Sequence, residues 1–238
     1  MSNYGLVRNT QLAYGNYCTV NGCNSKRKSG HRYCDQHKYR LLYRGDAEQQ
    51  KISLKTVNFA RRTVELLISD NRNNPSWGEL MDCIYRNWIT AETYVNAELN
   101  RYLTGTPSDR RVRRGLIICY DIFNNLGLEK AFITYCCWQY LQEWSPRLFA
   151  SDEAFRFQLV KSLRNQAKSY HTQDIDKKTG IPRAYSSPLY MKEREAAWEI
   201  LSGIFGSVGM QLHKQLERRA EKLRSNTERI RNAIKHIE

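Results

Sequence analysis

From about Leu54 onward, apolar residues recur at intervals of three and four, the period of an α-helix with one face turned to a core. The first such run consists of Leu54, Val57, Ala60, Val64 and Leu67. Pro75 ends this run, and Ser76 followed by Glu79 has the capping-box spacing that opens a second helix. Further helical runs follow and convincing strands are almost absent, so the pattern predicts a mainly α-helical body.

The last segment has the most regular pattern. Its apolar positions alternate steps of four and three, which is an a/d heptad seam, and they are Leu216, Ala220, Leu223, Thr227, Ile230, Ile234 and Ile237. Such a seam needs an apolar partner, either a helix of the same chain or a second copy or another protein docked on Leu216, Leu223, Ile230 and Ile237. Before the seam, glycines at 203, 206 and 209 predict a hinge or a face for close helix approach.

Residues 14–46 differ from the rest, because they contain turn formers and basic residues with few aliphatic ones. Side chains of this kind cannot build a core. The sequence therefore predicts a small N-terminal zinc-binding module (1–50), a helical bundle as the body (51–171), a basic loop or short hairpin (172–187) and C-terminal helices with a glycine hinge (188–238). The fold class is mainly α, ending in a long heptad helix.

Three cysteines and one histidine in this module have the spacing of metal ligands, Cys18-x4-Cys23-x10-Cys34-x2-His37. Thiolate and imidazole groups are the ligands of tetrahedral zinc in closed structural sites. A turn former pair at 21–22 can reverse the chain inside the first pair, and residues three apart share a helix face. We expect one structural Zn²⁺ per chain, with His31 as an alternative fourth ligand. Zinc binding, worth about 10–16 kcal/mol in small modules, can replace the missing core.

The chain carries 38 Lys and Arg against 24 Asp and Glu, a net charge of +14. Nucleic acid, DNA or RNA, is the commonest intracellular polyanion and hence the expected partner. The candidate contacts near the zinc ligands are Lys26, Arg27, Lys28, Arg32, Lys38, Tyr39, Arg40, Tyr43 and Arg44; those at a helix start are Arg110, Arg111, Arg113 and Arg114. Tyrosines can stack on bases or pack around the metal. Cations at a helix start oppose its dipole, which indicates an anionic partner or a solvated surface.

Other features exclude some classes of protein. The seven cysteines are odd in number and the chain starts without an apolar signal segment, so a disulfide framework is not expected. No stretch reaches the ~18 apolar residues of a membrane span. We expect an intracellular, cytoplasmic protein without membrane association.

One part of the chain resembles a known family. The segments Cys18-Thr-Val-Asn-Gly-Cys23, Gly30-His-Arg-Tyr-Cys34-Asp-Gln-His37-Lys-Tyr-Arg40 and Arg44-Gly-Asp46 are similar to a short zinc module of phage and mobile-element proteins. This module often lies beside HNH-type homing endonuclease domains. The resemblance implies that Cys18, Cys23, Cys34 and His37 bind zinc, that residues 38–44 form a helix facing nucleic acid, and that the host is a bacterial or phage-infected cell. It covers residues 18–46, and residues 51–238 resemble no family.

The function predicted is a non-enzymatic, zinc-containing protein that binds nucleic acid, with no catalytic residue. An HNH site needs a paired histidine and asparagine that cannot be assembled here, since His171, His213 and His236 are isolated. The first alternative is an inhibitor or adaptor that docks on a nucleic-acid-handling complex through the C-terminal seam. The second is a divergent metal-dependent nuclease using His171, Asp174 and Asp176.

Overall fold

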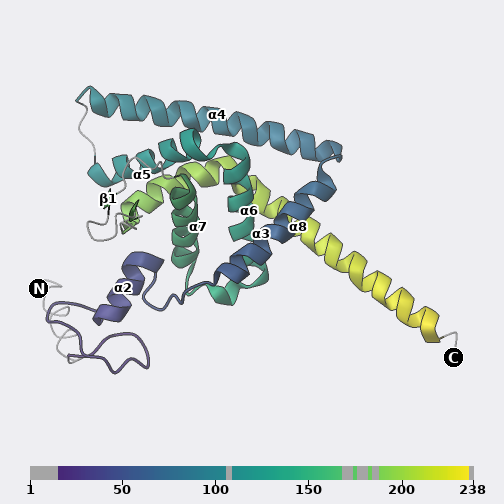
Figure 1. The fold of residues 1–238 in the computed structure, drawn as a ribbon, viewed down its shortest axis with the longest axis horizontal. Coiled ribbons are helices and arrows are strands. Elements are labelled where there is room, and N and C mark those ends of the chain that lie inside the picture. Colours follow the sequence, from purple (N-terminus) through teal and green to yellow (C-terminus); the bar gives the residue numbers. More distant parts are fainter. Residues whose placement is uncertain (1–15, 106–108, 168–173, 176–181, 184–187, 236–238) are drawn as a thin grey trace, which may run out of the picture.

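The computed structural model describes residues 16–105, 109–167, 174–175, 182–183 and 188–235. Its α-helices are α2 (Asp35–Arg44), α3 (Leu54–Asn71), α4 (Pro75–Leu103), α5 (Arg110–Asp121), α6 (Leu128–Trp144), α7 (Asp152–Ala167) and α8 (Met191–Lys235). A π-helical turn (Ile122–Leu126) extends α5, and a short 3₁₀ helix (Pro146–Leu148) follows α6. The prediction of a mainly α-helical fold with a small N-terminal module is confirmed (Figure 1).

Local capping explains where several helices begin. The Ser53 side chain accepts a hydrogen bond from the Thr56 N–H at 3.1 Å, so α3 begins at the residue after it. Helix α4 is capped by Asn74, whose side chain accepts from the Ser76 N–H, with Pro75 in the first turn. The expected capping box starting at Ser76 was therefore wrong, because proline at the first helical position leaves the cap to the residue before it.

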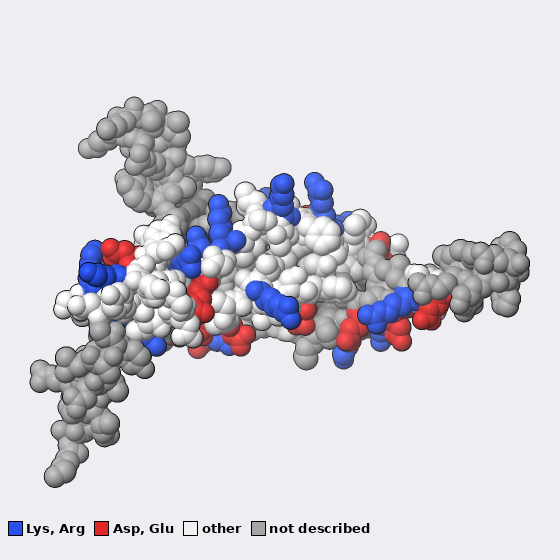
Figure 2. Space-filling view, turned by 90° about the horizontal axis from the view of Figure 1, so that it is seen from below, with Lys and Arg blue, Asp and Glu red and all other residues white. Residues whose placement is uncertain are grey.

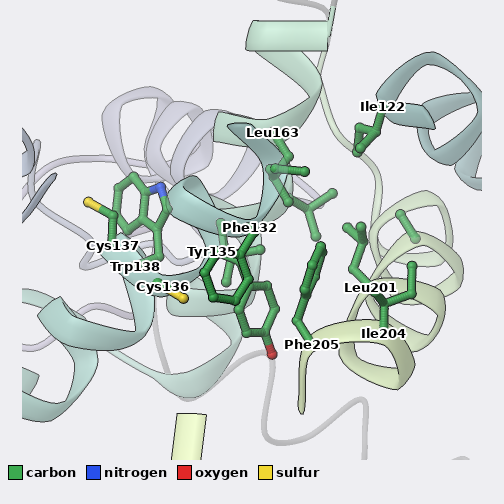
Figure 3. Packing of buried hydrophobic residues seen from close by; sticks show 14 of the residues in the cluster. Ile122, Phe132, Tyr135, Cys136, Cys137, Trp138, Leu163, Leu201, Ile204 and Phe205 are labelled. Carbon is green, nitrogen blue, oxygen red and sulfur yellow. The ribbon is translucent and has the colours of Figure 1, made fainter. Parts of the chain in front are cut away.

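Helix α6 lies at the centre of the body, against α3, α7 and α8. Its buried residues cover most of its circumference, so it lacks a polar face. Phe205 of α8 lies among its aromatic rings, with centroid distances of 5.0 Å to Tyr135 and 6.2 Å to Phe132 (Figure 3). Cys136 and Cys137 are buried in the same core, and burial raises the pKa of Cys137 to about 11. These thiols are packing residues.

Helix α8 is continuous from Met191 to Lys235, so the expected glycine hinge was wrong. A Cβ atom at Gly203 or Gly206 would meet nothing within 4 Å, so no described helix approaches closely at these two glycines. The close approach occurs instead at Gly115 of α5, where a Cβ would lie 2.6 Å from the Glu193 carbonyl oxygen and 2.7 Å from Ala196 Cβ. Glycine therefore sets the separation of α5 and α8.

The second half of α8 extends beyond the body (Figure 1). The side chains of Leu216, Leu223, Ile230 and Ile237 lie outside the described residues. The described side chains of this half are exposed, and they are Lys214, Glu217, Arg218, Glu221, Arg224, Ser225, Thr227 and Glu228. Whether a helix of the same chain, a second copy or another protein packs on the heptad seam is therefore not tested, and the seam stays a prediction.

Between α7 and α8, two-residue strands β1 (Asp174–Ile175) and β2 (Pro182–Arg183) pair antiparallel, with Asp174 opposite Arg183. His171 and Asp176, the other residues of the nuclease alternative, lie outside the described part of the chain. Among the described residues, the helices are too short or too polar to cross a membrane.

Candidate metal centre

The module brings its four predicted ligands together from two local structures. Tyr17 and Lys26 form an antiparallel bridge, and the Cys18 N–H donates to the Ser25 carbonyl at 2.9 Å. The chain reverses between them through Gly22, whose φ of 74° is left-handed. This turn supplies Cys18 and Cys23.

The other two ligands come from the start of α2. Cys34 is the N-cap residue of this helix, and its carbonyl accepts from the Lys38 N–H at 2.9 Å. His37 lies three residues further, on the same helix face. The predicted pairing of a turn with an incipient helix is confirmed.

The four ligand atoms all lie within 4.8 Å of one another. His37 Nδ1 is 3.3 Å from the sulfurs of both Cys18 and Cys34, and the Cys23 and Cys34 sulfurs are 4.0 Å apart. A zinc tetrahedron with Zn–S of about 2.3 Å and Zn–N of about 2.0–2.1 Å has edges of about 3.8 Å between sulfurs and about 3.6 Å between sulfur and nitrogen. The cluster therefore fits one tetrahedral ion, and its cysteines are free.

Burial supports this assignment. From residue 16 to residue 44, Cys18, Cys34 and His37 are the buried side chains, with 8%, 4% and 7% of their surface exposed. A folded segment whose interior consists of ligand side chains has no apolar core to stabilise it. A metal ion would provide the missing cohesion.

The structure decides between the two candidate histidines. His31 is exposed and outside the cluster, and its carbonyl accepts from Arg27 Nη1 at 2.6 Å. His37 is therefore the histidine that could complete a four-ligand metal site, through Nδ1. With Nδ1 on a metal, Nε2 would carry the proton, so the 3.5 Å contact between Nε2 and Arg40 Nη1 would join two donors and would not be a hydrogen bond.

Hydrogen bonds and burial shift the pKa values of the Cys23 and Cys34 thiols in opposite directions. The backbone and hydroxyl of Ser25 hold the pKa of Cys23 below its usual value, whereas burial raises the pKa of Cys34. A coordinated thiol is deprotonated by the ion itself. Three thiolates around a bound Zn²⁺ would leave one net negative charge at the cluster.

The end of α2 docks the module on α7. Lys161 Nζ donates to the Tyr43 carbonyl at 2.7 Å and Gln158 Nε2 to the Arg44 carbonyl at 3.0 Å. Gly45 then takes φ 89°, and a Cβ there would lie 2.4 Å from Phe157 Cβ. Arg44 Nη1 donates to the Gln49 carbonyl at 3.2 Å. Arg44, predicted to contact nucleic acid, thus contributes to the joint between module and body.

Two polar side chains complete this joint. Asp46 Oδ2 accepts from the Ser151 hydroxyl at 2.8 Å, and Ser151 Oγ accepts from the Ala154 N–H at the start of α7. Gln49 is fully buried, donating to the Leu148 carbonyl at 2.9 Å and accepting from the Ala150 N–H at 2.9 Å. Sequence reasoning missed Gln49, since nothing local distinguishes a glutamine whose partners are about a hundred residues away.

The remaining predicted contacts of the module lie on its surface. Lys26, Lys28 and Arg32 are exposed, and Lys38 and Arg40 are half-buried. Lys28 pairs with Asp35 at 3.1 Å. Among the described residues, Lys26, Arg32, Lys38 and Arg40 form no ion pair, so no carboxylate in this part of the chain neutralises them.

The helix-start arginines are all exposed, but two have partners within the chain. Arg114 Nη1 lies 3.2 Å from Oε1 of the buried Glu193, and the Arg111 guanidinium lies 4.7 Å from the Tyr190 ring centroid. Asp109 caps α5 and pairs with Lys192 at 2.7 Å, and this hydrogen bond holds the pKa of Asp109 below its usual range. Contacts between α5 and α8 thus account for part of this charge without any external anion.

In Figure 2, lysines and arginines are distributed along the face shown rather than gathered into one patch, and acidic side chains lie mostly along one edge. The module and the start of α5 lie toward the same end of the molecule, opposite the C-terminus (Figure 1).

No protein-family model matches this chain, and neither a curated protein nor a solved structure matches it. The resemblance to the phage zinc module stays a prediction.

Proposed function

We propose that this chain is a non-enzymatic zinc protein that binds nucleic acid through the surface of its N-terminal module. The observation that carries the proposal is a compact Cys₃His cluster in a module that also bears cations without an ion-pair partner among the described residues, namely Lys26, Arg32, Lys38 and Arg40. Docking on α7 gives this surface a rigid support. The proposal includes a cytoplasmic location and a phage or mobile-element origin, which the sequence resemblance supports.

The test is the salt dependence of binding. Each phosphate contact changes the log–log slope of affinity against salt by about −0.9 on duplex DNA and about −0.7 on single strands. Four contacts predict a fall of roughly 10²-fold in affinity between about 50 and about 200 mM salt. The triple change Lys26→Gln, Arg32→Gln and Lys38→Gln should flatten the slope by about 2–3 without removing zinc, since none of the three is a ligand.

The matched control neutralises cations that already have partners. Arg61 pairs with Glu65 at 3.0 Å and Arg101 with Glu98 at 2.8 Å, both on the body. Arg61→Gln with Arg101→Gln should leave the slope unchanged. A zinc-loaded, folded protein that binds neither duplex DNA, single-stranded DNA nor RNA at low salt would overturn the proposal.

An adaptor role is the second candidate, favoured by the half of α8 that extends beyond the body (Figure 1). On this alternative another protein docks on the heptad seam. Leu223→Asp would then release that partner while the fold survives, whereas Ser225→Asp, on an exposed position of the same helix, would not. If Leu223→Asp lowers the melting temperature, Ser225→Asp does not, and no partner is lost, the seam contributes to the stability of this chain rather than to partner binding.

A further inference from the structure

Helix α2 presents a pair of tyrosines. Tyr39 and Tyr43 are four residues apart, with ring centroids 4.6 Å apart and planes inclined by 31°. Tyr39 is 54% exposed, Tyr43 is half-buried, and neither belongs to the metal cluster or to the buried core. Packing around the metal, one of the two roles expected for the tyrosines, therefore does not explain Tyr39.

The geometry of the pair leaves one ring face available. The rings are tilted and lie at a distance typical of aromatic pairs, so Tyr43 contacts one side of Tyr39 and the opposite ring face is turned away from Tyr43. Contact with Tyr43 also restricts the rotamers of Tyr39 before anything binds. A ligand that stacks there pays less side-chain entropy than it would on a free tyrosine.

Cations on α2 and α7 lie near the pair. Lys38 and Arg40 precede and follow Tyr39, and neighbouring helix positions diverge by about 100°, so the two cations flank its stripe on either side. Neither forms an ion pair among the described residues. Lys161 of α7 adds a third cation at the Tyr43 carbonyl, at 2.7 Å.

We propose that Tyr39, supported by Tyr43, is a stacking platform for bases of single-stranded nucleic acid, with Lys38 and Arg40 at the adjacent phosphates. The inference rests on the proposed nucleic-acid-binding function and specifies its substrate. Base faces inside a duplex are already stacked on one another, whereas those of a single strand are accessible to an aromatic ring. An exposed ring flanked by cations fits the single strand, in DNA or in RNA.

The experiment measures the affinity of the zinc-loaded 238-residue chain for oligothymidylate, oligouridylate and a DNA duplex of equal length. Stacking is tested by Tyr39→Ala, and charge by Lys38→Gln. The control is Tyr94→Ala, since Tyr94 on α4 has the same exposed fraction, 54%, outside the module. Tyr39→Trp keeps an aromatic face and should retain binding.

Loss of one stacked base predicts a fall of about 5- to 150-fold in single-strand affinity for Tyr39→Ala, with the salt slope unchanged. Duplex affinity should not change, and Lys38→Gln should flatten the slope instead. The two single strands distinguish DNA from RNA. If Tyr39→Ala behaves as Tyr94→Ala does while the wild type still binds nucleic acid, the platform is wrong and the proposed function stands. A wild type that binds none of the three probes overturns both.

Discussion

Gly45 is the position at which the joint between module and body can be tested by adding one methyl group. Its φ of 89° disfavours any side chain, and a Cβ would lie 2.4 Å from Cβ and 2.7 Å from Cγ of Phe157. These atoms are at the base of a ring that is 1% exposed, so it cannot move aside easily. Gly45→Ala therefore combines backbone strain with overlap.

Gly30→Ala separates these two effects. Gly30 has a similar φ of 78°, but a Cβ there would meet nothing within 4 Å. At either position, replacing glycine by alanine strains the left-handed backbone, and part of this cost is offset because alanine makes the unfolded chain less flexible. The net cost is about 1 kcal/mol. Overlap in a packed site adds about 1–3 kcal/mol at Gly45 alone.

The overlap is comparable with the energy that holds the joint. The bonds from Gln158 and Lys161 to α2 carbonyls contribute about 0.5–1.5 kcal/mol and about 1.5–3 kcal/mol, since the second donor is charged. Gly45→Ala should therefore shift the docking equilibrium by roughly 5- to 150-fold toward the open state relative to Gly30→Ala. Hydrogen exchange of amides 41–50 measures this shift.

Zinc content should be the same in both variants, because no ligand lies in the joint. Equal protection of amides 41–50 in Gly45→Ala and Gly30→Ala would show that the contact with Phe157 does not hold the module. Loss of zinc from Gly45→Ala would show that docking and metal binding are coupled, contrary to this expectation.

Three further predictions concern the metal and the body. Cys34→Ser should release one zinc per chain and His31→Gln should not, measured by elemental analysis; the reverse would overturn the ligand assignment. Gly115→Ala should cost about 1–3 kcal/mol and lower Tm by about 2–4 °C per kcal/mol, whereas Gly203→Ala, in open space, should raise Tm; equal shifts in thermal melts would contradict this. Burial raises the pKa of Asp121, so its folded state binds a proton more readily than the unfolded chain. Asp121→Asn should stabilise at neutral pH and lose that gain in acid; a gain constant with pH would refute it.

The ligand set was predictable because all of its determinants lie within twenty residues. Spacing, a turn former and an incipient helix suffice to bring three thiols and an imidazole together. The choice of His37 over His31 was left open by the sequence, since both lie within reach of the cysteines. Only the tertiary structure shows that His37 belongs to the cluster and that His31 is exposed.

The helix-start arginines illustrate the limit of local reasoning. Four cations at positions 110–114 oppose the dipole of α5, which is a property of the sequence. Their partners Tyr190 and Glu193 are about eighty residues away and reach them through the packing of α5 on α8. The prediction of a close helix approach at the glycines of α8 failed for the same reason. Close approach depends on which helix lies opposite, and α8 approaches another helix closely at Gly115 of α5.

The sequence by itself thus determined the helical class, the start of a helix at about Leu54 and the four-ligand module, since each depends on interactions between residues near one another in the chain. Tertiary structure alone decided how the module is held. Gln49, Asp46 and Gly45 gain their roles from α7 and the loop before it, about a hundred residues later. A short-range pattern encodes the energy of a turn or a helix, but the energy of a docking joint exists only once distant segments meet.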